Sequence, residues 1–182
     1  IINPINANLV CIGKLLKRYF RILPNNNIPV TPPRPIGSKN LKSYANKRHE
    51  VFEKIMKENN INVITIEMEV NTFSINENQH YINYMFNNYK NIDGVFATDN
   101  MAIQIIKEAQ KRGIRIPEEF KVIGYDGTEN SKLFIPKLTT IKQPIKEICM
   151  DAVDKLIKLI NGEEIKNKES FHSVELIEGE TT

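Results

Sequence analysis

The sequence has no tryptophan, only two cysteines and no long apolar run among its 182 residues. A membrane-spanning helix needs about 18 consecutive apolar residues. No segment approaches that length, so we expect no membrane-spanning helix and no membrane partner. Cys11 and Cys149 belong to no CxxC pair or histidine cluster. The sequence therefore predicts neither a zinc site nor a disulfide framework, and it favours a reduced, cytoplasmic setting.

An excess of charge of one sign is also missing. The 25 Lys and Arg residues outnumber the 22 Asp and Glu residues by only three, and the charges are dispersed along the chain. This excess is too small to predict nucleic-acid binding by this chain alone.

Motifs for catalysis and cofactor binding are absent too. His49, His80 and His172 lie in separate segments with no GxSxG nucleophile motif nearby. The adjacent acids Glu118 and Glu119 are typical of a solvated turn, and the chain has no Walker loop and no GxGxxG. We therefore predict no enzyme, no cofactor and no metal site.

The chain does contain a regular alternation of short apolar runs and amphipathic stretches of helical length. This order is typical of βαβ units and predicts an α/β fold with a parallel sheet. We expect strands at residues 28–31, 62–68, 94–97, 120–126, 137–143 and 172–177. We expect helices at residues 12–21, 41–58, 76–89, 99–112 and 144–159.

Two of these helices carry clear boundary signals. Asp99 lies where an N-cap is expected and Gly113 where a C′ glycine is expected. Pro144 suits the first position of the last helix, which residues 161–162 end. Ligands of open parallel sheets bind at the carboxyl ends of strands. The residues found there are Phe73, Thr98, Asp99, Tyr125, Asp126 and Gln143.

Four motifs then occur in one order and at one spacing within residues 94–144. They are D-x-M-A at a helix start, G-I-R-I-P at a bend, V-I-G-Y-D at a turn and P-K-L-T-T-I-K-Q-P at a crossover. In this combination they resemble the lactose-repressor family of bacterial transcription regulators. The resemblance extends from Cys11 to Thr182. The GYDGT and IEGETT segments are most similar to the branch of sucrose operon repressors.

The resemblance implies a periplasmic-binding-protein-like domain of two lobes, each with a parallel sheet flanked by helices. It assigns residues 11–142 to the second lobe, residues 1–10 and 143–178 to an incomplete first lobe, and residues 179–182 to a C-terminal tail. A long stretch of the first lobe is absent, either because the protein is a remnant or because the sequence is incomplete, and we favour the second. The helix-turn-helix that binds DNA in this family is absent too.

The resemblance also implies an effector site for a sugar. Arg48 matches a sugar-contacting arginine, although Val51 stands where the family prefers glycine, and Asp126 matches a carboxylate that accepts sugar hydroxyls. Phe73 matches a ring that covers the apolar face of the sugar. Thr98 and Asp99 replace a frequent Asn-Asp pair, so that only a hydroxyl remains at Thr98, and Asp99 fits an N-cap better than a contact.

The partners implied are a sugar effector, operator DNA through the missing N-terminal domain, and a second copy of the protein. We expect the homodimer contact to include Leu133 and Phe134, an apolar pair in a loop. The function expected is a sugar-sensing repressor domain. Three alternatives stay open: a transport-type sugar-binding protein, a catabolite-control regulator with a phosphocarrier partner and, less favoured, a sugar-modifying enzyme.

Overall fold

A computed structural model describes residues 29–35, 44–68 and 75–182, with side chains described at 48–66 and 78–182. The expected helix at 12–21 and the candidate Phe73 lie outside these residues. The elements are β1 (Pro29–Pro35), α2 (Tyr44–Glu58), β2 (Ile64–Met68), α3 (Ile75–Asn88), β3 (Gly94–Phe96), α4 (Asp99–Lys111), β4 (Lys121–Asp126), α5 (Glu129–Leu133), β5 (Thr139–Lys142), α6 (Ile145–Ile160) and β6 (Glu175–Ile177).

The strands form one six-stranded sheet in the order β2-β1-β3-β4-β5-β6. Neighbouring strands from β2 to β5 are parallel, and β6 joins β5 antiparallel. The predicted α/β class is confirmed. β1 pairs on both sides although it contains four prolines, and its register with β2 shifts between Thr31 and Arg34. Proline has no N–H to donate, and Pro32 and Pro33 lie at this irregularity.

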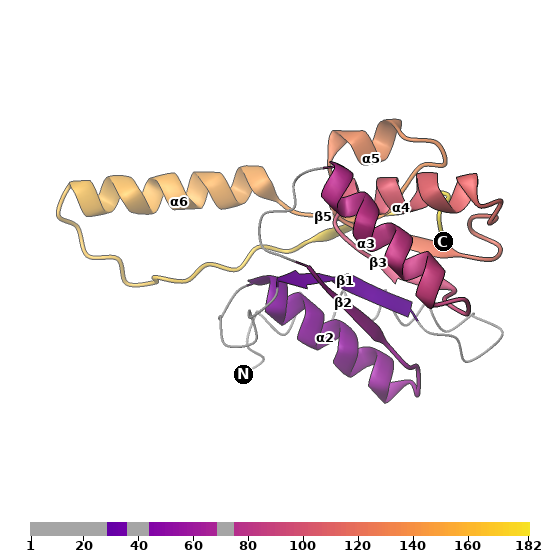
Figure 1. The fold of residues 1–182 in the computed structure, drawn as a ribbon. Coiled ribbons are helices and arrows are strands. Elements are labelled where there is room, and N and C mark those ends of the chain that lie inside the picture. The colour runs from indigo at the N-terminus through magenta and orange to yellow at the C-terminus, as the bar shows by residue number, and fades with distance from the viewer. Residues whose placement is uncertain (1–28, 36–43, 69–74) are drawn as a thin grey trace.

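Helices cover both faces of the sheet, with α3 and α4 on one face and α2 on the other (Figure 1). Alternate residues of the strands therefore enter two separate cores. Val95 and Val122 pack with α3 and α4. Phe96 and Ile123 pack with Phe52 of α2. The burial of both faces explains why these strands appear in the sequence as continuous apolar runs.

Helix α4 shows how the sequence sets an element boundary. The N-cap is Thr98, with extended backbone, and Asp99 is the first helical residue, so the predicted N-cap at Asp99 is corrected by one position. Gly113 has a φ of 74°, as expected for a C′ glycine that ends a helix in the left-handed region.

Helix α6 projects from the sheet, and the chain then returns to it as β6 (Figure 1). No residue of α6 is buried. Because β6 pairs with β5, residues 175–177 belong to the same sheet as β1 to β5. In the described part of the chain, no helix is both long and apolar enough to cross a membrane.

The C-terminal tail, residues 179–182, fills the gap between the first residues of β4 and β5. Thr181 is fully buried. Its hydroxyl donates to the Val122 carbonyl at 2.6 Å and accepts from the Thr139 N–H at 3.0 Å. Its carbonyl accepts from the Val122 N–H at 2.8 Å. The tail thus satisfies backbone groups that β4 and β5 leave unpaired where they diverge.

Candidate functional site

The candidate site lies at the carboxyl ends of β3, β4 and β5. Thr98 follows β3, Tyr125 and Asp126 end β4, and Gln143 follows β5. Parallel strands present these ends at one edge of the sheet. Arg48, in the first half of α2, reaches the same edge, because its guanidinium carbon lies 4.3 Å from the centroid of the Tyr125 ring.

Asp126 is held in a strained conformation at this edge. Its φ of 126° is one that L residues rarely adopt, and such strain persists only where the surroundings impose it. Gln143 makes two bonds to this residue: Nε2 donates to Oδ1 at 2.7 Å, and the backbone N–H donates to the Asp126 carbonyl at 3.2 Å. The following Gly127 has a φ of 69° and lies against the backbone of Lys142, which leaves no room for a Cβ.

Burial raises the pKa of the Asp126 carboxyl above its ordinary value. The Gln143 hydrogen bond and the Arg48 charge act in the opposite direction, and the negative charge of Asp99 adds to the rise. Arg48 and Asp126 therefore influence each other electrostatically across the strand ends. A half-buried carboxylate beside a guanidinium offers acceptors and donors to the same small polar ligand.

Arg48 is oriented by a column of aromatic rings. Its guanidinium stacks on Tyr125, whose ring meets Phe96 edge-on at 6.2 Å between centroids. Phe96 in turn stacks on Phe52 of α2 at 5.4 Å. A planar guanidinium stacked on a ring keeps its N–H edges available for hydroxyl groups. Val51 of α2 is partly buried against this core.

Asp99 forms part of the framework beneath the site. Its carboxylate is fully buried. It accepts hydrogen bonds from the Thr128 N–H at 2.6 Å, the Thr128 hydroxyl at 3.0 Å and the Thr140 hydroxyl at 2.5 Å. It lies against Gly124, where a Cβ would collide with it. A carboxylate with no exposed surface presents nothing to a ligand, so the expectation of an effector contact by Asp99 is corrected.

Thr98 is partly exposed beside this carboxylate. It is the N-cap residue of α4, but its side chain makes no capping hydrogen bond. Its hydroxyl is therefore available at the strand end. The structure brings Arg48, Thr98 and Asp126 to one edge of the sheet, while Phe73 lies outside the described residues.

Two residues of the site were not among the predicted contacts. Tyr125 supports Arg48, and Gln143 holds Asp126. The sequence placed both residues at strand ends, and this position was the feature that could have identified them as site residues. Their roles depend on pairings between β4, β5 and α2 that no local pattern specifies.

The two residues of the predicted dimer contact, Leu133 and Phe134, differ in exposure. Leu133 is 79% exposed and Ile135 83% exposed. Phe134 instead packs against the core formed by α3 and α4, with Lys107 Nζ 5.7 Å from its ring centroid. The strongly exposed apolar side chains here are therefore Leu133, at the end of α5, and Ile135, which follows the helix.

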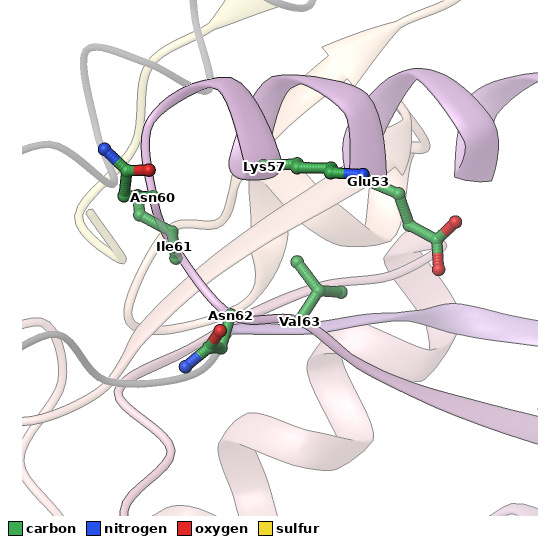
Figure 2. Close-up of a pocket in the computed structure, with 6 residues that line it drawn as sticks. All are labelled: Glu53, Lys57, Asn60, Ile61, Asn62 and Val63. Carbon is green, nitrogen blue, oxygen red and sulfur yellow. The ribbon is translucent and has the colours of Figure 1, made fainter.

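A hollow of about 490 Å³ lies apart from the strand-end site (Figure 2). It is lined by Glu53, Lys57, Asn60, Ile61, Asn62 and Val63. These residues lie at the end of α2 and the approach to β2, which is the amino end of that strand. The hollow contains none of the site residues. Among the described side chains, no three His, Cys, Asp or Glu residues lie together as metal ligands would.

The family model of a periplasmic binding protein-like domain matches residues 34–182 of this sequence. The match covers most of the chain, including Arg48, Thr98 and Asp126. The chain belongs to this family. The fold predicted from the motifs is confirmed.

Similar sequences within this family are lactose-repressor-type regulators, as the motifs predicted. The chain is 35% identical over 177 residues to the sucrose operon repressor of Streptococcus mutans, a match covering 93% of the chain and 48% of that protein. It is 33% identical over 135 residues to the HTH-type transcriptional regulator MalR of Clostridium butyricum, covering 72% of the chain and 39% of that protein. The chain thus spans about half the length, or less, of these curated relatives.

Solved structures of the family share the architecture. One is a periplasmic binding protein/LacI transcriptional regulator from Alkaliphilus metalliredigens in complex with D-xylulofuranose. It superimposes with a TM-score of 0.77 at 26% identity, covering 99% of this chain and 64% of that one. The Lac repressor bound to ONPG gives a TM-score of 0.75 at 25% identity, covering 93% and 50%.

Proposed function

We propose that this chain is the sugar-sensing part of a bacterial transcriptional repressor of carbohydrate-utilisation genes. The observation that carries the proposal is the placement of a stacked guanidinium, Arg48, beside a half-buried carboxylate, Asp126, at the strand ends. The names of the relatives support a sugar operon as the target of regulation.

A sugar suits this arrangement on chemical grounds. The N–H edges of Arg48 donate to vicinal hydroxyls, the Asp126 carboxylate accepts from hydroxyls, and the Thr98 hydroxyl can do either. Phe73 is proposed to cover the apolar face of the sugar. None of these groups is arranged as an acid–base pair with a nucleophile, so the proposal is binding without turnover and without a cofactor or metal.

The lobe assignment rests on α6. Eight large apolar residues of this helix are between 38% and 74% exposed. At 100° per residue they occupy an arc of roughly 200°, which is wider than the stripe of a surface helix and typical of a helix packed within a core. The eight are Ile145, Ile148, Met150, Val153, Leu156, Ile157, Leu159 and Ile160.

We therefore assign residues 1–10 and 143–174 to a first lobe whose other segments are not in this sequence, and residues 11–142 to the second lobe. We propose that the first-lobe segment ends before Glu175, and not at residue 178 as expected, because β6 pairs with β5. The effector would lie between the two lobes and bias their relative orientation, which is a difference in affinity between two states. Operator binding would be carried out by a segment outside this chain, in a cytoplasmic homodimer.

The test uses the complete polypeptide that contains this chain. Calorimetric titration with sucrose, ribose and lactose is combined with a mobility-shift titration on operator DNA. Saturable binding of one sugar, together with a change in operator affinity when that sugar is present, is the expected result. Sugar binding with no operator affinity would favour the transport-type binding protein, and an operator complex unaffected by any of the three sugars would contradict the proposal.

A further inference from the structure

Gln143 occupies the junction between the candidate site and helix α6. It directly follows β5, and Pro144 is the N-cap of α6. Its two hydrogen bonds to Asp126 use both the side-chain amide and the backbone N–H. Its own carbonyl accepts from the N–H of Ile145, the first residue of α6. One residue therefore connects the acceptor of the site to the start of the helix.

The geometry at Asp126 depends on this connection. The strained φ of Asp126 requires support. Gln143 donates two hydrogen bonds to Asp126, one to its backbone carbonyl and one to Oδ1 of its side chain. Within the described part of the chain, no protein donor is found for Oδ2. Gln143 thus fixes one carboxylate oxygen and leaves the other for a ligand.

Helix α6 is attached to the sheet at its amino end, where Gln143 and Pro144 connect it to β5. None of its residues is buried. At the sheet it continues from β5 through Gln143, and the chain returns through β6, where Lys142 pairs with Glu175 at 3.5 Å. Asp126 and the first turn of α6 are thus joined by a continuous set of hydrogen bonds through Gln143.

We propose that Gln143 is a positioning residue that aims the Asp126 carboxylate at the effector and transmits effector binding to α6. This inference rests on the proposed function of the same site. A sugar hydroxyl that bonds to Asp126 Oδ2 stabilises the same carboxylate orientation that the Gln143 hydrogen bond to Oδ1 stabilises. Sugar binding and the position of α6 are then coupled, and the coupling is reciprocal.

The charged groups around Asp126 determine how a substitution at Gln143 would change the Asp126 pKa. Arg48 approaches from α2, Asp99 lies beneath from α4, and Lys142 is the cross-strand partner in β5 with its ammonium on Glu175. Replacing Gln143 by leucine removes a donor that lowers the Asp126 pKa. Replacing it by glutamate keeps the shape of the side chain but places a second carboxylate against Asp126. The two carboxylates repel each other when both are ionised, and they can share a proton only at lower pH.

The experiment compares Gln143→Leu and Gln143→Glu with the wild type in the complete polypeptide. Gln110→Leu and Gln110→Glu, at an exposed position of α4, serve as matched controls. The first readout needs no sugar: carboxyl-carbon NMR of Asp126 should show a raised pKa in Gln143→Leu and no change in the controls. An unchanged Asp126 pKa would overturn the positioning role.

The second readout is sucrose affinity as a function of pH. Gln143→Leu should weaken sucrose binding about tenfold at pH 8, because a hydrogen bond to a charged group is lost, and should show no recovery as the pH falls. Gln143→Glu should bind weakly at pH 8 and recover toward wild type as the pH falls to 5.5. A purely structural role would give two variants with the same pH profile, and this result would overturn the proposal.

The third readout is hydrogen exchange in the first turn of α6. Adding sucrose should change the exchange of these amides in wild type and in the controls, and the change should be lost in Gln143→Leu at saturating sucrose. An identical change in that variant would overturn the coupling. If the wild type binds ribose or lactose in place of sucrose, the second and third readouts use that sugar. If it binds none of the three, the proposed function is wrong, and the Asp126 pKa still decides the positioning role.

Discussion

Arg48 and Asp126 act as a pair at the strand-end site, because each lies in the electrostatic field of the other. Arg48→Lys replaces a planar fork with a single ammonium group, and Asp126→Asn replaces two acceptors with one. Each change should weaken sugar binding by about 1–3 kcal/mol, since a buried polar group loses a partner.

Isothermal titration of the complete polypeptide with sucrose measures this effect. Arg115→Lys is the matched control, because Arg115 is exposed, lies outside the site and pairs with Glu119, four residues further along the chain, at 2.9 Å. Unchanged affinity in both site variants would remove Arg48 and Asp126 from the site.

Asp93 makes stability depend on pH. The residue is 7% exposed, and neither carboxylate oxygen has a hydrogen-bond partner among the described residues. Burial raises its pKa from 3.8 to about 6. The folded state therefore holds a proton that the unfolded chain releases near pH 4, so stability falls as the pH rises from about 4 to about 6.

Asp93→Asn removes this titration. The stability of the variant relative to the wild type should increase by roughly 3 kcal/mol between pH 4 and pH 7, at about 1.4 kcal/mol for each unit of pKa shift. Urea unfolding at a series of pH values measures the difference. A constant difference across this range would show that Asp93 is ionised in the folded state throughout.

At the scale of elements, the C-terminal tail forms hydrogen bonds with the backbone of β4 and β5. Thr181→Val keeps the shape of the side chain but removes the hydroxyl that serves both the Val122 carbonyl and the Thr139 N–H. Two buried backbone groups would lose a partner, and we expect a loss of about 2–4 kcal/mol in the free energy of unfolding.

Thr182→Val is the control for the tail. Among the described residues, the Thr182 hydroxyl bonds to the Thr139 hydroxyl, at 2.9 Å, and to no backbone group, and the residue is partly exposed. Thermal unfolding should show a small change for Thr182→Val and a large one for Thr181→Val. Similar melting temperatures for the two variants would mean that the tail adds little to the sheet.

Strands and helices differ in how well the sequence predicted them. The helices α3, α4 and α6 begin and end within one residue of the predictions, because capping residues and glycines act locally. Strand β1 runs to Pro35, beyond the predicted residue 31, since β2 pairs with it despite its prolines. Helix α5 is only five residues long and was not predicted.

For the whole molecule, the exposed pair Leu133 and Ile135 predicts a contact between copies of the protein. Large apolar side chains with about four-fifths of their surface exposed are unusual in a monomer. The double variant Leu133→Asp, Ile135→Asp should convert a dimer of the complete polypeptide into a monomer at micromolar concentration.

Sedimentation equilibrium measures this change. Lys132→Asp, next to Leu133 in α5, provides a control for the effect of added negative charge, because Lys132 is already polar and pairs with Glu129. A double variant that is still dimeric, or a wild type that is monomeric, would contradict the assignment.

The sequence by itself determined the α/β class, the order of the elements and the family, because alternating periodicity and cap residues are local properties and the four motifs keep one spacing. The strand ends also placed Thr98 and Asp126 at a common edge, and the resemblance added Arg48 to the same site. Only the tertiary structure decided what each does there. Whether a carboxylate is a contact or part of the framework depends on which threonines surround it, and Asp99 and Asp126 differ in this respect. The roles of Tyr125 and Gln143 likewise arise from neighbours that are distant in the sequence, across strands β4 and β5 and helix α2.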